Sequence, residues 1–210
     1  MSFANRASAK VFRDKLEIPV IQGGMGVGIS MGKLAGSVAA CGGMGVISTA
    51  LIGFREEDFY QNHVEADVRA LRKEIQIAKE IANGRGMIAI NAMTVTTDYR
   101  ECIEAAVREG IDAIISGAGL PLALPELVDG KDVLIAPIVS SAKAAALIMR
   151  SWNKKCERKP DFIVVEGSGA GGHLGFKKEE LLEKSYQPLT EIGSDVVKVC
   201  GDIPVFAAGG

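Results

Sequence analysis

Residues 161–176, DFIVVEGSGAGGHLGF, join a short apolar run to a glycine-rich segment that carries one histidine. The segment contains a literal G-x-G-x-x-G at Gly167, Gly169 and Gly172. A dinucleotide-binding loop of this form needs a helix that opens at its last glycine, and an acidic residue about 20 positions later at the end of the next strand. Neither is present, because Gly172 is followed by His-Leu-Gly and the chain near position 187 reads KSYQPL. We therefore interpret the stretch as a buried strand followed by a different kind of ligand loop.

Short apolar runs like FIVVE recur along the chain. They do not alternate apolar with polar residues, which is typical of strands buried on both faces in a parallel sheet. Helical patterns separate them, so the order predicts an α/β fold with right-handed crossovers. The seven runs are IPVIQGGM (18–25), MGVIST (44–49), GMIAINAM (86–93), AIISGAG (113–119), VLIAPIVS (133–140), DFIVVEG (161–167) and IPVFAAGG (203–210).

Three of the helical patterns have clear boundaries. Residues 64–83 and 141–151 carry apolar residues at helical spacing, the second after a serine pair suited to an N-cap. Residues 98–109 begin with Asp98 and Glu101 in the spacing of a capping box and end before a glycine. Helices of this kind are expected to cover the sheet.

Two architectures fit strands that alternate with helices: an open doubly wound sheet and a (β/α)8 TIM barrel. In an open sheet ligand loops gather at one switch point, whereas in a barrel they follow many strands around the carboxyl rim. Glycine-rich or polar loops follow the first, third, fourth, sixth and seventh runs, which favours the barrel. We expect residues 1–210 to form a single TIM-barrel domain that covers about seven of the eight βα units. Residues 176–202 are expected to supply a crossover helix plus an insertion.

Composition narrows the function. Of 210 residues 48% are hydrophobic and 24% charged, as in a globular protein. The net charge of -2 indicates neither a nucleic-acid partner nor an anionic membrane surface. The N-terminus lacks a secretory apolar region, and no apolar stretch reaches the roughly 18 residues of a membrane span. Four scattered cysteines without a C-x-x-C pair, and only two histidines, favour reduced thiols in a cytoplasmic protein without a metal site.

Polar residues stand at the ends of several runs, where barrel chemistry is built. His173 lies just past the sixth run, and imidazole exchanges a proton near working pH, so we expect a catalytic or substrate-contacting role. The glycines before it expose backbone N–H groups that suit an anionic group. Asn91 places an amide, both donor and acceptor, at the end of an apolar strand and predicts a ligand contact. Gln22 and Glu166 occupy similar positions, whereas His63 is expected to be an exposed structural residue.

With these residues in place, the chain resembles the nitronate monooxygenase (2-nitropropane dioxygenase) family of FMN-dependent TIM-barrel enzymes. The flavin-dependent enoyl-ACP reductases belong to the same wider group. The resemblance spans nearly the whole chain and rests on PVIQGGMG in the first run, GGMGVIS in the second, the strand-end Asn91, AGGHLG and the terminal PVFAAGG.

The resemblance implies an FMN cofactor, no metal, and a role for each matching residue. His173 would be the catalytic residue above the flavin ring. Gly24 and Met25 would lie beside the ring, and the two last glycines would begin a phosphate-binding loop. The residues implied to bind the cofactor are Gly24, Met25, Asn91, Glu166, Gly171, Gly172, Gly209 and Gly210.

The chain departs from the family's pattern in three respects. Glu166 stands where many members carry Gln, and Gly169 where they carry Glu, which changes the charge near the ring. The family continues past AAGG with a helix and an eighth strand that bears another phosphate-binding turn. We therefore expect these residues to be a fragment that ends after the seventh strand.

The leading hypothesis for function is an FMN-dependent oxidoreductase that oxidises alkyl nitronates with dioxygen. The alternative enzyme is an NAD(P)H-dependent enoyl-thioester reductase on the same scaffold. A hypothesis of another class is a non-catalytic barrel piece that binds flavin or phosphate. The expected partners are a small-molecule substrate and O2, and neither nucleic acid nor a membrane is expected. A homo-oligomer is compatible with the sequence.

Overall fold

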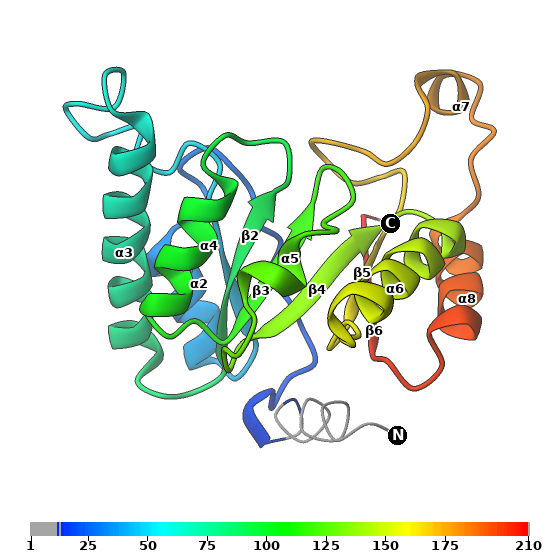
Figure 1. The fold of residues 1–210 in the computed structure, drawn as a ribbon, viewed down its shortest axis with the longest axis horizontal. Helices are drawn as coiled ribbons and strands as arrows, with labels where there is room; N and C mark the ends of the chain where they lie inside the picture. The colour runs from blue at the N-terminus through cyan, green and yellow to red at the C-terminus, as the bar shows by residue number, and fades with distance from the viewer. Residues whose placement is uncertain (1–11, 13, 210) are drawn as a thin grey trace.

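The computed structural model describes residue 12 and residues 14–209. Six strands form one sheet in the order β1-β2-β3-β4-β5-β6, and all neighbours run parallel. The sheet curls into part of a barrel with the helices on its outer side (Figure 1), which confirms the expected α/β class and partial TIM barrel. The strands are β1 (Met44–Ser48), β2 (Met87–Met93), β3 (Ala113–Gly117), β4 (Leu134–Val139), β5 (Ile163–Glu166) and β6 (Val205–Ala208). The helices are α2 (Gly32–Ala40), α3 (His63–Ala82), α4 (Tyr99–Arg108), α5 (Leu124–Leu127), α6 (Ala142–Cys156), α7 (Lys178–Leu182) and α8 (Leu189–Cys200).

The strands are apolar on both faces because each face meets a different part of the core. Outward-facing residues such as Ile90 pack against the helices, and inward-facing residues such as Ala89 pack inside the curl. Phe12, Phe162 and Phe206 fill the interior, with ring centroids 5.1 Å apart for the first two and 5.7 Å for the last two. A fully buried aliphatic side chain contributes about 1.5–3 kcal/mol, so this two-sided burial is what holds the sheet.

The prediction of a first strand at residues 18–25 is wrong. The segment makes a single parallel bridge, Ile21 to Met44. The bonding begins normally, since Met44 N donates to Val20 O at 2.9 Å and Gln22 N donates to Met44 O at 3.0 Å. The next amide, Val46 N, donates instead to the side-chain Oε1 of Gln22 at 3.0 Å. The side chain thus replaces the backbone carbonyl, and the glycines that follow leave the sheet.

The helices follow the sequence pattern closely. α3 matches the expected range 64–83 to within one residue, whereas α6 starts as expected after Ser141 but continues to Cys156, beyond the expected end at residue 151. The Ser141 hydroxyl caps α6 by accepting a hydrogen bond from Ala144 N at 3.2 Å. Residues 176–202 hold the short α7 and then α8, as expected for an insertion plus a crossover helix. Among the described residues, no helix combines the length and hydropathy needed to cross a membrane.

The capping box expected at Asp98 and Glu101 is wrong. Helix α4 begins at Tyr99 as predicted, but Asp98 makes no side-chain cap bond. Its carboxylate accepts a hydrogen bond from the Cys102 thiol at 3.1 Å and is only 5% exposed. The carboxylate therefore faces the buried interior rather than the first amides of the helix.

The amino edge of the sheet is fastened by two aspartates that precede strands. Asp112 accepts from Ile88 N at 2.9 Å and pairs with Lys15 at 2.6 Å. Asp161 accepts from Ile135 N at 2.8 Å and pairs with Arg158 at 2.9 Å. Each aspartate thus ties the start of its own strand to the neighbouring strand.

Candidate active site

Polar side chains occupy an inward-facing position at or near the carboxyl end of three strands. Side chains alternate between the faces of a strand, so a residue two positions after an inward-facing one also faces inward. The strands are parallel and end at one edge, and the register places Ser48 beside Asn91. The inner residues Val46, Ala89 and Val164 are followed two positions later by Ser48, Asn91 and Glu166.

Asn91 has an amide that the described part of the protein does not use. Its backbone carbonyl accepts from Thr49 N at 3.0 Å and from the Thr49 hydroxyl at 3.2 Å, but its half-buried side chain has no hydrogen-bond partner among the described residues. Gly24 lies directly against this side chain, and a Cβ on Gly24 would overlap it. The structure therefore brings Gly24 and Asn91 together, as expected from sequence. Buried polar groups are normally bonded, so the free amide makes Asn91 a candidate ligand contact.

The loop of residues 23–30 is organised by Ser30, a residue that sequence reasoning missed. The buried Ser30 hydroxyl donates to Gly23 O at 2.9 Å and accepts from Met25 N at 2.9 Å. Gln22 Nε2 donates to the same hydroxyl at 2.8 Å, so this side chain shapes the loop from within. The Met25 side chain is left 49% exposed at the rim.

Ser48 was also missed, although the sequence carries a signal for it. It ends the second apolar run in the way that Asn91 ends the third. Its hydroxyl accepts from Ala50 N at 3.4 Å and lies next to Gly26. The same strand-end rule that selected Asn91 would have selected Ser48.

Glu166 carries a half-buried carboxyl group at the end of β5. It ends β5 beside Ala208 of β6, and no hydrogen bond or ion pair joins its side chain to any described residue. Burial raises the pKa of Glu166 above its usual range. Such a group can hold a proton and donate it to a ligand more readily than an exposed glutamate.

The glycine-rich loop after β5 is joined to the end of β6. Gly167 N donates to Ala208 O at 2.8 Å, and Gly169 N donates to Gly209 O at 3.0 Å. Gly209 has a positive φ of 67°, and a Cβ there would overlap Ala170. The two expected ligand loops are therefore held together; Gly210 lies outside the described residues.

The second half of this loop is open. Apart from the flanking residues in the chain, no atom of the described residues lies within 4 Å of the Cβ position of Gly171 or Gly172, and His173 is exposed. Among the described residues, His173 has no hydrogen bond or ion pair, with Asn91 or with any other side chain. No helix begins at Gly172, because the next helix starts at Lys178. The segment therefore lacks the helix that a dinucleotide-binding loop needs. His63 is exposed, as expected, and its Nε2 lies 3.1 Å from the Thr97 hydroxyl.

The arrangement defines a parallel (β/α)-barrel chain with a candidate ligand site on the carboxyl rim. The profile of the nitronate monooxygenase family matches residues 9–210, so the chain belongs to that family. This finding confirms the resemblance that the motifs indicated.

Solved structures with the same fold support the architecture. The M276A variant of FabK from Thermotoga maritima is 23% identical with a TM-score of 0.70, over 95% of this chain and 56% of that one. A nitroalkane oxidase from Streptomyces ansochromogenes is 15% identical with a TM-score of 0.72, over 94% of this chain and 60% of that one. The chain thus spans a little over half the length of these proteins. A search of curated protein sequences finds no match.

Proposed function

We propose that the protein is an FMN-dependent oxidoreductase that oxidises alkyl nitronates with dioxygen. One observation carries the proposal: in a chain of this family, two polar side chains near the carboxyl end of the inner barrel face, Asn91 and Glu166, have no hydrogen-bond partner among the described residues. Polar groups that are half-buried and unsatisfied at the rim of a barrel are typical of a ligand site.

The residues at this edge fit a flavin. The Asn91 amide offers a donor and an acceptor to the edge of a heteroaromatic ring, and Gly24 beside it leaves room because it has no Cβ. The exposed amides of Gly171 and Gly172 suit an anionic or carbonyl group, and Gly209 begins the turn proposed to hold the phosphate. When bound, FMN would supply the electron transfer between nitronate and dioxygen.

The protein's own residues would handle the proton and the orientation of the substrate. His173 is proposed to accept the proton α to a nitro group, or to donate a hydrogen bond to the nitronate oxygens. Glu166, whose pKa is raised by burial, is proposed to offer its carboxyl group to the cofactor as a hydrogen-bonding partner. The exposed Met25 is proposed to cover the ring from the rim.

The proposal is tested with purified full-length protein titrated with FMN and then assayed with nitronates. We expect a flavin absorbance spectrum and nitronate-dependent oxygen consumption. Rapid anaerobic bleaching of the flavin by NADH or NADPH would contradict the monooxygenase and indicate the enoyl-thioester reductase. Protein that stays colourless and cannot be loaded with FMN would contradict both enzymes.

A further inference from the structure

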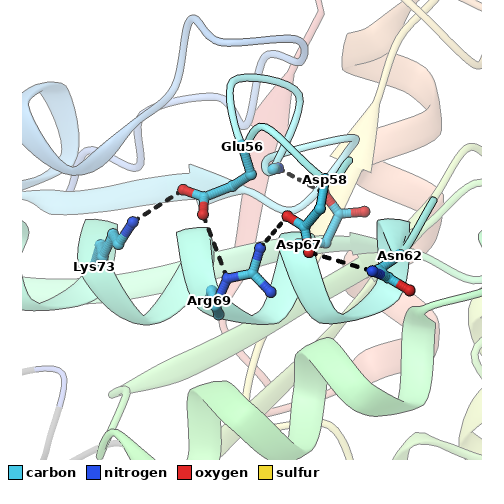
Figure 2. Close-up of polar contacts among 7 residues, drawn as sticks. Glu56, Asp58, Asn62, Asp67, Arg69 and Lys73 are labelled. Carbon is cyan, nitrogen blue, oxygen red and sulfur yellow. Dashed lines mark hydrogen bonds and ion pairs between the residues drawn. The ribbon is translucent and has the colours of Figure 1, made fainter. Parts of the chain in front are cut away.

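The loop of residues 49–62, between β1 and α3, lies on the same rim as the candidate site (Figure 1). Ion pairs attach it to α3: Glu56 binds Lys73 at 3.0 Å and Arg69 at 3.4 Å, and Asp58 also binds Arg69 (Figure 2). The Arg69 and Lys73 side chains are 44% and 65% exposed. Exposed ion pairs contribute little stability, so they do not by themselves fix the loop.

The buried attachment of this loop is Asp67 of α3. Its side chain is 1% exposed, and its Oδ1 accepts a hydrogen bond from Gly53 N at 2.5 Å. Gly53 is pressed onto the helix, because a Cβ there would lie 2.5 Å from Ala66 C and 2.6 Å from Asp67 N. Losing the acceptor would leave the buried Gly53 amide without a hydrogen-bond partner, which is unfavourable. Asp67 is therefore the contact that sets the position of Gly53.

From Gly53 the contacts lead directly to the candidate site. The next residue, Phe54, lies against Gly28, where a Cβ would be 2.8 Å from Phe54 Cζ. The Arg55 guanidinium lies over the Phe54 ring, 4.9 Å from its centroid. Gly28 belongs to the 23–30 loop, which also carries Gly24 beside Asn91.

We propose that Asp67 is a positioning residue for the rim site. By holding Gly53 it sets Phe54 against Gly28 and keeps the 23–30 loop beside Asn91. The link to a flavin rests on the function proposed above, whereas the docking of the loop does not.

The attachment of the 49–62 loop to α3 through Asp67, called docking below, is expected to depend on pH. Burial, and then the neighbouring Asp98, raise the pKa of Asp67 to about 6, although the Gly53 amide opposes this. Other ionisable groups near Asp67 and Asp98 are His63 on α3, and Cys102 and Glu101 on α4. A carboxyl whose pKa is raised in the docked state favours docking fully below its ordinary value near 3.8, and this contribution is lost as the pH rises through 6.

The test is hydrogen exchange of residues 50–62 in the full-length protein at pH 5.0 and pH 7.5, corrected for intrinsic rates. For the wild type we expect roughly ten-fold greater protection at the lower pH, from a carboxyl whose pKa moves from its ordinary value to about 6 on docking. Asp67→Ala is expected to lose protection at both pH values. Asp67→Asn still accepts from Gly53 and can donate to Asp98, so it should stay protected at both. Glu57→Gln, an exposed acid of the same loop, should behave as wild type.

Two results would overturn the docking role: unchanged protection in Asp67→Ala, or wild-type pH dependence in Asp67→Asn. The second variant keeps the test valid if Asp67→Ala does not fold. The FMN dissociation constant then tests the link to the site, with an expected increase of about ten-fold in Asp67→Ala and rescue by Asp67→Asn. If the loop loses protection but FMN affinity does not change, the positioning role is wrong. If the wild type binds no FMN while the exchange results hold, the proposed function fails and the docking role stands.

Discussion

The two edges of the sheet treat their polar side chains in opposite ways. At the amino edge Asp112 and Asp161 each bond a neighbouring strand's amide and a basic side chain. At the carboxyl edge the side chains of Asn91 and Glu166 lie near the end of the inner face without a partner among the described residues. Folding explains the first edge, because an unsatisfied buried polar group is costly. Folding does not explain the unpartnered side chains at the carboxyl edge. This difference is the reason for proposing the ligand site at the carboxyl edge.

The largest effect is expected at the carboxyl edge, in catalysis. His173→Ala should lower nitronate turnover about 1,000-fold, within the range that general acid–base residues contribute. Its side chain is exposed and unbonded among the described residues, so the free energy of unfolding should change by less than about 0.5 kcal/mol. Steady-state kinetics and denaturant unfolding check the two parts. Unchanged turnover of every nitronate tested would remove His173 from the mechanism.

The next effect is expected at the amino edge, in stability. Asp161→Ala leaves the Ile135 amide without its 2.8 Å acceptor and Arg158 without its ion pair, so we expect a loss of about 3 kcal/mol in urea unfolding. Asp161→Asn restores an acceptor and should recover part of the loss. Asp195→Ala, which removes an exposed pair with Lys198, should cost no more than about 1 kcal/mol. Equal losses in the two alanine variants would contradict the contrast between the edges.

A smaller effect is expected for Asn91→Ala. Removing one hydrogen-bonding group should weaken FMN binding about ten-fold, corresponding to about 1.4 kcal/mol. The flavin-free protein should lose little stability, because the amide bonds no described residue. Asn153→Ala, on the exposed surface of α6, is the matched control and should bind FMN normally. A fluorescence titration that gives both variants the same dissociation constant would count against a flavin contact at Asn91.

The smallest effect is expected for Glu166→Gln. Because burial raises the pKa of Glu166, this carboxyl stabilises the fold least once the pH has risen above its usual range near 4.5. The glutamine variant should therefore gain stability relative to the wild type as pH increases from 4 to 8. Urea unfolding across that range checks the sign, and a gain that shrinks with rising pH would show that the carboxylate is stabilised in the fold.

Local pattern predicted most of the fold because each strand is buried on both faces, which leaves an unbroken apolar run in the sequence. It failed where a side chain took a backbone role. The Gln22 side chain accepts a hydrogen bond from the Val46 amide and so ends the backbone pairing of residues 18–25 with β1. The pattern IPVIQGGM does not predict this contact. It also failed at Asp98, whose capping spacing was outweighed by a buried contact with Cys102.

The candidate site was predicted in part for the same reason. Asn91 and Glu166 were found because they interrupt apolar strands at their ends. Ser48 follows the same rule and was overlooked. Ser30 and Asp67 act through bonds to residues 7 and 14 positions away in the sequence, and such contacts become visible only in three dimensions.

The most direct measurement is a crystal structure of the full-length protein with FMN bound. We expect the flavin ring at the carboxyl edge, in contact with Gly24 and hydrogen-bonded to the Asn91 amide, with Gly171 and Gly172 on the same rim. A flavin bound elsewhere, or an Asn91 amide that remains unbonded in the complex, would contradict the assignment of this edge as the active site.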